Sequence, residues 1–286
     1  MSLRDLYIRP ILYFCESGYR GLSKIALQVE ELFPVKLKDR GNRKKTSNSM
    51  MMKEDVYGDG LKAYINGDKK AVFVVESDIA ETEEWPISTF FRDYKEMPKA
   101  ERLALQRCSG SVLDVGAGAG SHSLYLQQHG GNVTALDISE GAVEVMQQRG
   151  IEKTILADFF QYSGATYDTI LMLMNGVGIV GKLNNLSSFF IQAKKLLNSG
   201  GKILLDSSDL IYLFEEEDGS VMIDLNGSYY GELEYTFEFN GKKGNPFNWV
   251  FVDYEKLEEC AKLHGFSCKK VYEDDHYLYL AEIKLL

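Results

Sequence analysis

The sequence is poor in cysteine and proline, and it has no long apolar run. Its 286 residues include four cysteines and five prolines. The cysteines lie far apart, without the CxxC or Cys/His spacing of a metal site, so we expect free thiols in a reducing compartment and no bound metal. The N-terminal stretch LYIRPILYF is interrupted by Arg9 and Pro10, which makes it too short for a membrane span and too broken for a signal peptide. These absences predict a cytoplasmic protein that does not enter a membrane.

The chain also lacks an excess of positive charge. Its formal net charge is -10 at pH 7, which argues against nucleic acid or an anionic membrane as a partner. The basic stretch Lys36–Lys45 has no interleaved aromatic residues, and no second helix of a helix-turn-helix is visible, so we expect a mobile connection there. The remaining composition, 45% hydrophobic and 26% charged, is that of a globular protein long enough to bury a full core.

Helical and extended patterns divide the chain into two parts. Residues 1–107 carry mainly helical patterns, at 22–33, 57–67 and 90–108, with one extended piece at 69–78, and predict a mostly helical N-terminal extension. Residues 108–286 alternate strand and helix patterns, which is typical of a doubly wound parallel α/β sheet with right-handed crossovers. The strands of this second part are expected at 111–115, 132–137, 153–157, 167–174 and 201–207, and its helices at 120–130, 139–150 and 183–201.

The C-terminal third departs from this alternation. Residues 218–250 are rich in strand patterns, and Asn-Gly pairs at 226–227 and 240–241 indicate hairpin turns. We expect a β-meander inserted after the fifth strand, at the sheet edge where ligands of open α/β sheets bind. The chain then closes with a helix at 254–265 and two strands, at 266–274 and 276–285, whose short link permits only antiparallel pairing.

A glycine-rich loop follows the first strand of the α/β part, in SVLDVGAGAGSHSLYL. The loop fits neither GxGxxG, because position 121 is serine, nor the GK[ST] ending of a Walker loop. Asp114, two residues before the first glycine, would repel a phosphate at the next helix N-terminus, because two unit charges about 4 Å apart cost on the order of 4 kcal/mol at an effective dielectric near 20. The same carboxylate favours a ligand that carries an ammonium or sulfonium group.

Two further acidic residues follow strands. Asp137 ends NVTALD, where an acidic side chain accepts hydrogen bonds from ribose hydroxyls in doubly wound folds. Asp158, in ADFF, can accept from an adenine amino group, with Phe159 near the face of the base, although an aspartate at that place can also simply start a turn. A nucleoside with a cationic amino-acid tail is S-adenosylmethionine.

The C-terminal 180 residues resemble the class I S-adenosylmethionine-dependent methyltransferases. The resemblance is carried, in order, by VLDVGAGAG, VTALDIS, LADFF, YDTILMLMNGVG and LLNSGGKILLD. It implies a Rossmann-like sheet of seven strands in the order 3-2-1-4-5-7-6, with the last strand antiparallel, in residues 108–286. The stretches YGDGLKAYINGD and FFRDYKEMPKAERLAL are similar to a bacterial subgroup of these enzymes whose acceptor is undefined.

The resemblance also implies site residues. The cofactor S-adenosylmethionine, and its product S-adenosylhomocysteine, would be bound by Asp114, Gly116, Ala117, Gly118, Gly120, Asp137, Ile138, Asp158, Phe159, Met174 and Asn175. In relatives the segment before the first motif caps the cofactor, which makes Phe90, Phe91 and Tyr94 candidate contacts, with ordinary helix packing as the alternative. Tyr94, together with Tyr230 and Trp249 of the meander, is a candidate for binding a small apolar or cationic acceptor by stacking or cation–π contact.

These observations predict methyl transfer by direct in-line displacement to a small-molecule acceptor. Alignment of the reacting groups supplies roughly 7–11 kcal/mol in such reactions, and a base is needed only if the acceptor must lose a proton. We assign no catalytic residue, because His122 and His276 are isolated histidines. The fourth strand carries MNGVG and not [DN]PP[YFW], and no Pro-Cys pair offers a thiolate, which argues against methylation of nucleic-acid bases.

Three other functions stay open. The chain could be an RNA or protein methyltransferase that docks its substrate through Lys36–Lys45. It could be a non-catalytic S-adenosylmethionine-binding module, because cofactor motifs establish binding and not turnover. A nicotinamide-dependent dehydrogenase is disfavoured by Asp114 and the missing GxxG. The expected assembly is a monomer or a homodimer.

Overall fold

A computed structural model of the chain describes residues 55–216, 218, 220–223 and 227–286. The expected helix at 22–33, the basic stretch Lys36–Lys45 and the first Asn-Gly pair, at 226–227, lie wholly or partly outside the described residues. Within them, no helix is both long enough and apolar enough to cross a membrane.

The larger of two sheets has seven strands in the order β11-β12-β7-β6-β3-β4-β5. The five strands β5, β4, β3, β6 and β7 are parallel, β12 is antiparallel to β7, and β11 is antiparallel to β12. This arrangement confirms the predicted order 3-2-1-4-5-7-6 with an antiparallel last strand. The strands are β3 (Ser111–Val115), β4 (Asn132–Asp137), β5 (Thr154–Leu156), β6 (Tyr167–Met172), β7 (Leu197–Ser208), β11 (Phe266–Glu273) and β12 (Leu278–Leu285).

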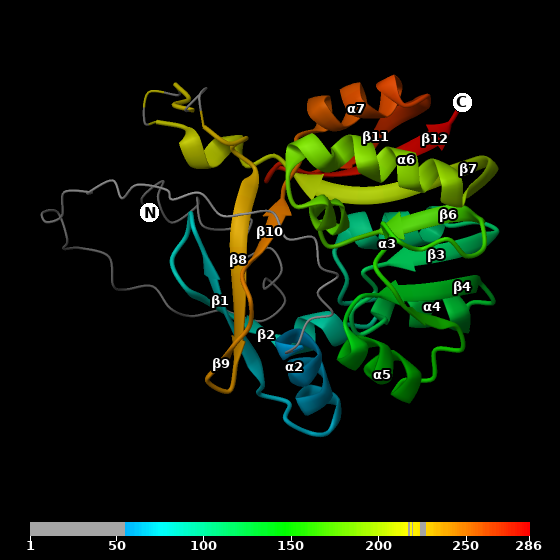
Figure 1. The fold of residues 1–286 in the computed structure, drawn as a ribbon, viewed down its shortest axis with the longest axis vertical. Coiled ribbons are helices and arrows are strands. Elements are labelled where there is room, and N and C mark those ends of the chain that lie inside the picture. Colours follow the sequence, from blue (N-terminus) through cyan, green and yellow to red (C-terminus); the bar gives the residue numbers. More distant parts are fainter. Residues whose placement is uncertain (1–54, 217, 219, 224–226) are drawn as a thin grey trace, which may run out of the picture.

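Helices cover both faces of this sheet (Figure 1). The helices are α3 (Lys99–Arg107), α4 (Ser121–Gln128), α5 (Glu140–Gln148), α6 (Leu186–Leu196) and α7 (Tyr254–Leu263). Side chains alternate between the two faces along each strand, so Leu204 of β7 packs with α3 and α4 while Leu205 packs with α6 and α7. Helices α4, α5 and α7 lie within two residues of their expected bounds, whereas α6 ends at Leu196, directly before β7 begins, and the helix expected at 90–108 is limited to α3 after a short 3₁₀ turn, Ile87–Phe91.

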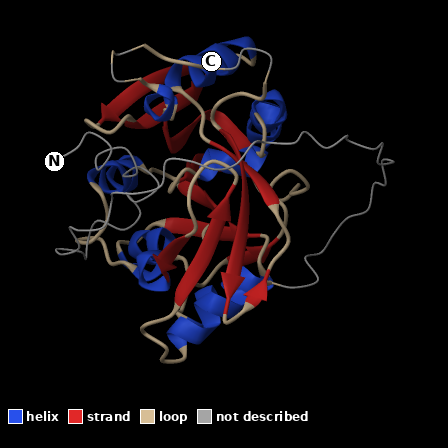
Figure 2. Cartoon of the chain, turned by 90° about the vertical axis from the view of Figure 1, so that its left-hand side faces the viewer, coloured by secondary structure: helices blue, strands red, loops and turns tan. Residues whose placement is uncertain are grey.

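The second sheet joins two segments that are far apart in the sequence. Its strands run in the order β10-β8-β1-β2, with β9 paired to β8, and all its pairs are antiparallel. The N-terminal part contributes β1 (Val72–Ser77) and β2 (Glu83–Pro86), and the meander contributes β8 (Glu232–Phe239), β9 (Lys242–Lys243) and β10 (Phe247–Val250). The second sheet stands beside the carboxyl ends of the parallel strands (Figures 1 and 2).

The hairpin of the meander confirms the turn expected at the second Asn-Gly pair. Asn240 and Gly241 link β8 to β9 with φ values of 50° and 75°. Two consecutive residues with positive φ make the tight turn whose twist suits a β-hairpin, and asparagine and glycine tolerate this conformation best.

The helix α2 (Val56–Ile65) packs against α5 through a close contact of glycines. A Cβ atom on Gly58 would lie 2.7 Å from Gly141 Cα, so neither position has room for a side chain. Asp55 stands at the N-terminus of α2 and holds both helices. Its Oδ1 accepts from Gly58 N at 2.9 Å, and its Oδ2 accepts from Gly141 N at 2.8 Å and from Ser139 Oγ at 2.7 Å. One carboxylate thus binds free N–H groups at the start of two helices.

Candidate active site

The glycine loop connects β3 to α4 at the carboxyl edge of the main sheet. Gly116, Gly118 and Gly120 have φ values of 68°, 56° and 80°, in the left-handed region that glycine adopts most easily. A Cβ on Gly120 would collide with Ile151 at 2.2 Å, whereas a Cβ on Gly116 would meet no atom within 4 Å. Gly120 is therefore required by packing, and Gly116 faces open space in which a ligand can approach the backbone. Beside it, Ala117 donates its N–H to Leu136 O at 3.1 Å, which ties the loop to β4.

Asp114 lies below this loop and is 2% exposed. It accepts a hydrogen bond from Ser123 Oγ at 2.7 Å. Burial raises the pKa of the Asp114 carboxyl, and His122 and Ser123 oppose this rise. The carboxylate therefore supports the first turn of α4 as well as placing negative charge behind the loop.

Asp137 connects the end of β4 to the glycine loop. Its Oδ2 accepts from Gly118 N at 2.8 Å and its Oδ1 accepts from Ser139 N at 2.9 Å. Burial raises the pKa of Asp137 to about 6. Each carboxylate oxygen keeps a second lone pair, which is what two ribose hydroxyls would need.

Tyr57 of α2 covers this corner of the site, and sequence reasoning missed it. A Cβ on Gly118 would lie 2.6 Å from the Tyr57 hydroxyl oxygen. Burial raises the pKa of Tyr57, and the carboxylates of Asp137 and Asp55 raise it further. Because Asp55 also fixes α2 to α5, the tyrosine is held over the loop by a packed helix and not by a free segment.

The expected adenine region combines apolar surface with a turn. Ile138 is 58% exposed and Leu156, at the end of the neighbouring strand, is 46% exposed, so both offer uncovered apolar surface. Asp158 Oδ1 accepts from Phe160 N at 2.9 Å, as a turn-forming aspartate does. Phe159 is 3% exposed and packs 5.8 Å from Phe189 of α6, which places its ring in the core beneath the site.

Met174 and Asn175 follow β6 in an unusual backbone conformation. Both have positive φ, 60° and 55°, which is uncommon for residues with a side chain and is found often at functional sites. Their N–H groups donate to Asp206 of β7 at 3.2 and 2.7 Å. The Asn175 side chain accepts from Ser207 Oγ at 2.8 Å and donates to Val250 O at 3.2 Å, which joins the ends of β6 and β7 to the second sheet.

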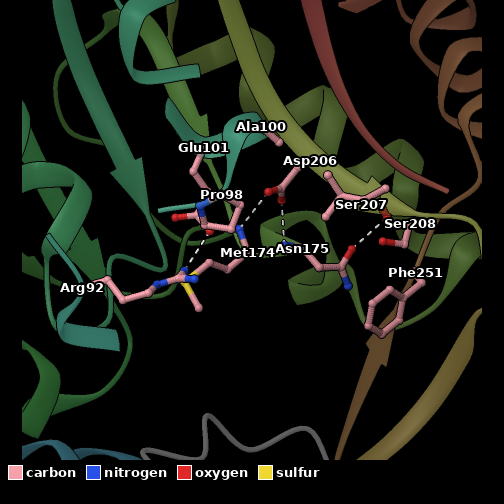
Figure 3. Close-up of a pocket in the computed structure, with 11 residues that line it drawn as sticks. Arg92, Pro98, Ala100, Glu101, Met174, Asn175, Asp206, Ser207, Ser208 and Phe251 are labelled. Carbon is pink, nitrogen blue, oxygen red and sulfur yellow. Dashed lines mark hydrogen bonds and ion pairs between the residues drawn. The ribbon is translucent and has the colours of Figure 1, made fainter. Parts of the chain in front are cut away.

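A cavity of about 30 Å³ opens beside these residues (Figure 3), enough for one or two water molecules. Its lining combines a few charged and polar side chains with apolar ones. It consists of Arg92, Pro98, Ala100, Glu101, Met174, Asn175, Asp206, Ser207, Ser208, Phe251 and Leu278.

A buried charge network borders the cavity. Glu101 Oε1 accepts from Arg92 at 2.8 Å and Glu101 Oε2 contacts His122 Nε2 at 2.8 Å. Glu101 raises the pKa of His122 against the effect of burial, which favours the ion pair with Glu101 over a free base. Arg92 is 8% exposed, and its Nε has no hydrogen-bond partner among the described residues. His276, the other histidine considered, donates its backbone N–H to Asp274 in the turn before β12.

Sequence reasoning missed Arg92, Glu101 and Asp206, although Arg92 and Asp206 each left a signal. Arg92 directly follows the two phenylalanines proposed as capping residues, and Asp206 follows the apolar run KILL just as Asp114 and Asp137 follow theirs. Phe90 itself packs 5.4 Å from Tyr57, and Phe91 packs 4.5 Å from Tyr64.

The three candidate acceptor residues lie in different surroundings. Tyr230 donates to Asp209 Oδ1 at 2.8 Å, beside the end of β7. Trp249 lies so close over Gly178 that a Cβ there would be 2.1 Å from the indole nitrogen. Tyr94 stacks on Tyr125 of α4 at 4.3 Å, which places it with the α3 and α4 cluster and apart from the second sheet.

Comparisons with known proteins agree with this geometry. Residues 113–205 match the family model described as a methyltransferase domain. A SAM-dependent methyltransferase from Bacteroides fragilis, solved in complex with S-adenosyl-L-homocysteine, is 42% identical, with a TM-score of 0.76 over 81% of this chain and 95% of that one. No curated protein is similar enough to count as a relative.

Two more distant structures share the fold alone. The CcbJ methyltransferase from Streptomyces caelestis is 14% identical, with a TM-score of 0.52 over 66% of this chain and 97% of that one. A S-adenosylmethionine-dependent methyltransferase from Clostridium acetobutylicum is 15% identical, with a TM-score of 0.50 over 68% of this chain and 92% of that one.

The fold and the loop define a class I methyltransferase scaffold, and the similarity to the Bacteroides protein extends over most of both chains. The chain belongs to the class I S-adenosylmethionine-dependent methyltransferases. It is an enzyme that uses S-adenosylmethionine and releases S-adenosylhomocysteine.

Proposed function

We propose that the enzyme methylates a small-molecule acceptor in the space between the carboxyl edge of the main sheet and the second sheet. The observation that carries this proposal is the second sheet itself, which joins residues 72–86 to residues 232–250 beside the strand ends. We assign residues 108–286 to the catalytic domain and residues 55–107 to its cap. The aromatic side chains Trp249 and Tyr230 belong to the wall that this cap shares with the meander.

The described residues fit S-adenosylmethionine at several independent points. Gly116 leaves open space for the methionyl part, Asp137 offers lone pairs to the ribose, and Ile138 with Leu156 offers apolar surface to the adenine. The unpartnered Nε of buried Arg92 suits the carboxylate of the methionyl tail. The cofactor supplies an activated methyl group, and the protein supplies binding and alignment.

Calorimetry with S-adenosylhomocysteine tests the cofactor assignment. We expect Asp137→Ala to weaken binding at least about thirtyfold, because two charge-assisted hydrogen bonds of roughly 1–1.5 kcal/mol each are lost. Asp68→Asn, an exposed carboxylate on the turn after α2, is the matched control and should bind like the wild type. Equal affinities for both variants would remove Asp137 from the site.

The role of Arg92 has its own test, which uses a ligand without the amino-acid tail. Arg92→Met should weaken S-adenosylhomocysteine binding at least about tenfold and leave 5′-methylthioadenosine binding within about twofold. A parallel loss for both ligands would show that Arg92 acts through folding, by its ion pair with Glu101, and not through the cofactor carboxylate.

A further inference from the structure

The cavity holds a buried carboxylate that has no counter-ion. Asp206 is 2% exposed, and its hydrogen bonds come from two backbone N–H groups, those of Met174 and Asn175. No lysine, arginine or histidine of the described residues forms an ion pair with it. A buried carboxylate without a cation is costly to fold, and such groups are found where a ligand or a reaction requires them.

The basic side chains near the cavity form ion pairs with a carboxylate other than Asp206. Arg92 and His122 both pair with Glu101, at 2.8 Å each. Two basic side chains, Arg92 and His122, therefore face three carboxyl groups, because Asp114 and Asp206 also interact with His122. Of the two carboxyl groups that line the cavity, Glu101 is paired and Asp206 forms no ion pair among the described residues, so a cationic ligand there would compensate the remaining negative charge.

Acidic and phenolic side chains also occur close to Asp206 in the sequence and in the core of the second sheet. Asp209 follows three residues later and accepts from Tyr230 and from Ile211 N, both on Oδ1. Tyr212 and Tyr235 belong to the cluster that contains Phe251, and their hydroxyls, in side chains that are 6% and 4% exposed, have no hydrogen-bond partner among the described residues. Phe251 lines the cavity itself. Carboxylates, phenol oxygens and aromatic rings together are the groups that bind an ammonium ion in proteins.

We propose that the acceptor is an amine, that its ammonium form binds against Asp206, and that Asp206 takes its proton before transfer. This proposal rests on the proposed function. The ammonium R–NH₃⁺ gives one proton to the Asp206 carboxylate and becomes R–NH₂. The nitrogen lone pair then forms the bond to the methyl carbon while the carbon–sulfur bond breaks, and its electron pair stays on sulfur as the thioether. The product is R–NH₂⁺–CH₃, and the proton on Asp206 returns to solvent.

The surroundings of Asp206 suit this exchange. Burial, and after it the negative charge of Glu101 of α3, raise the pKa of Asp206 to about 7, although the N–H groups of Asn175 and Met174 and the side chain of His122 of α4 act in the opposite direction. Arg92, which lines the same cavity, is paired with Glu101. A carboxyl group that titrates near neutrality can both accept and release a proton at working pH.

Matched pairs of amines and alcohols test the proposal on the full chain saturated with S-adenosylhomocysteine. The probes are benzylamine with benzyl alcohol, 2-phenylethylamine with 2-phenylethanol, and cyclohexylamine with cyclohexanol, measured by calorimetry at about pH 8, where these amines are cations. We expect at least one amine to bind about tenfold more tightly than its alcohol. In Asp206→Asn this preference should fall below about threefold, while Asp68→Asn keeps it.

Other outcomes overturn the proposal. Alcohols that bind as well as their amines, or no amine binding at about 10 mM, would contradict an amine acceptor. If Asp206→Asn loses S-adenosylhomocysteine affinity while its thermal melt is normal, the carboxylate serves the cofactor's own ammonium group. If Asp206→Asn does not fold, Asp206→Glu replaces it, and it should weaken amine binding at least about threefold with cofactor-product affinity unchanged. Absence of S-adenosylhomocysteine binding to the wild type would instead refute the proposed function.

Discussion

Replacing Asp55 tests whether one carboxylate holds helix α2 in place over the glycine loop. Asp55→Ala removes the acceptor for Gly58 N at the start of α2 and the acceptors for Gly141 N and Ser139 Oγ at the start of α5. Alanine offers no oxygen at this position, and the packing of Gly58 against Gly141 leaves little room for water to replace it.

The size of the effect follows from the hydrogen bonds lost at the start of the two helices. Asp55 is the N-cap of α2, and loss of such a cap costs about 1 kcal/mol. At α5 the N-cap is Ser139, which keeps its hydrogen bond from Ala142 N, but Gly141 N loses its acceptor at a cost of about 1 kcal/mol, so the total is about 2 kcal/mol of the free energy of unfolding. For a domain of this size, 1 kcal/mol corresponds to a change in Tm of about 2–4 °C. We therefore expect the Tm of Asp55→Ala to fall by about 4–8 °C.

The measurement is a thermal melt followed by calorimetry with S-adenosylhomocysteine. Asp59→Asn is the matched control, because Asp59 lies in the same turn of α2, is 42% exposed and pairs with Lys62 at 3.5 Å. Exposed pairs of this kind contribute under about 1 kcal/mol, so this variant should melt close to the wild type. Because Tyr57 is carried by α2, Asp55→Ala should also weaken S-adenosylhomocysteine binding by about threefold or more. Equal melting temperatures for the two variants would refute the role of Asp55 in holding α2 and α5 together. Unchanged S-adenosylhomocysteine affinity in a destabilised Asp55→Ala would refute the link to the cofactor.

Three further outcomes follow from the same contacts. Gly118→Ala should lower S-adenosylhomocysteine affinity at least about tenfold, because the φ of Gly118 is 56° and a Cβ there would meet the Tyr57 hydroxyl. The control is Gly130→Ala, since Gly130 has φ 79° but open space around it. This variant should change the thermal melt and not the calorimetric Kd. Burial raises the pKa of Asp137 to about 6, so its carboxylate is protonated as the pH falls through that value. The affinity for S-adenosylhomocysteine should then drop by up to about tenfold per pH unit. A Kd that stays constant from pH 8 to pH 5 would contradict the role of Asp137 as a hydrogen-bond acceptor for the ligand. Glu101→Gln should lower the free energy of unfolding in urea by about 3 kcal/mol, because buried Arg92 and His122 lose the carboxylate that they share. Glu273→Gln breaks an exposed ion pair with Lys270 and should cost less than about 1 kcal/mol. Similar losses in the two variants would show that the buried network contributes little to stability.

The main sheet was predictable because its signals are local. The strands β3 and β4 are apolar runs with an acidic residue at or next to their last position, and the helices after them are preceded by glycine or serine and followed two residues later by glycine. Each unit is therefore visible within about thirty residues. Parallel pairing then follows from the length of the crossovers. The glycine loop and Asp137 are part of the same units, which is why the sequence alone could propose them as the cofactor side of the site.

The second sheet could not be predicted in this way. Strand β1 pairs with β8 in the register Val74 with Glu238 and Ser77 with Tyr235, across a separation of more than 150 residues. Alternation identifies each strand by itself, but nothing within either segment specifies its partner, because register between distant strands depends on packing. The sequence therefore predicted an extended piece and a meander without the sheet that joins them.

The acidic residue Asp206 shows the same limit at the level of one side chain. It lies inside β7, two residues before the strand ends, and an aspartate within a strand ordinarily points to solvent. In this fold the face that carries Leu204 and Asp206 is covered by α3, a helix that precedes the whole sheet in the sequence. Burial by a distant element, and not the residue's neighbours in the chain, turns Asp206 from a surface carboxylate into one whose pKa is raised to about 7. Because that pKa exceeds the value near 3.8 of an exposed aspartate, the folded protein binds the extra proton between about pH 4 and pH 7, and stability declines as pH rises through this window. A cation bound against Asp206 would offset this loss of stability. The same buried carboxylate that weakens the fold at high pH therefore favours binding of the proposed ammonium form of the acceptor.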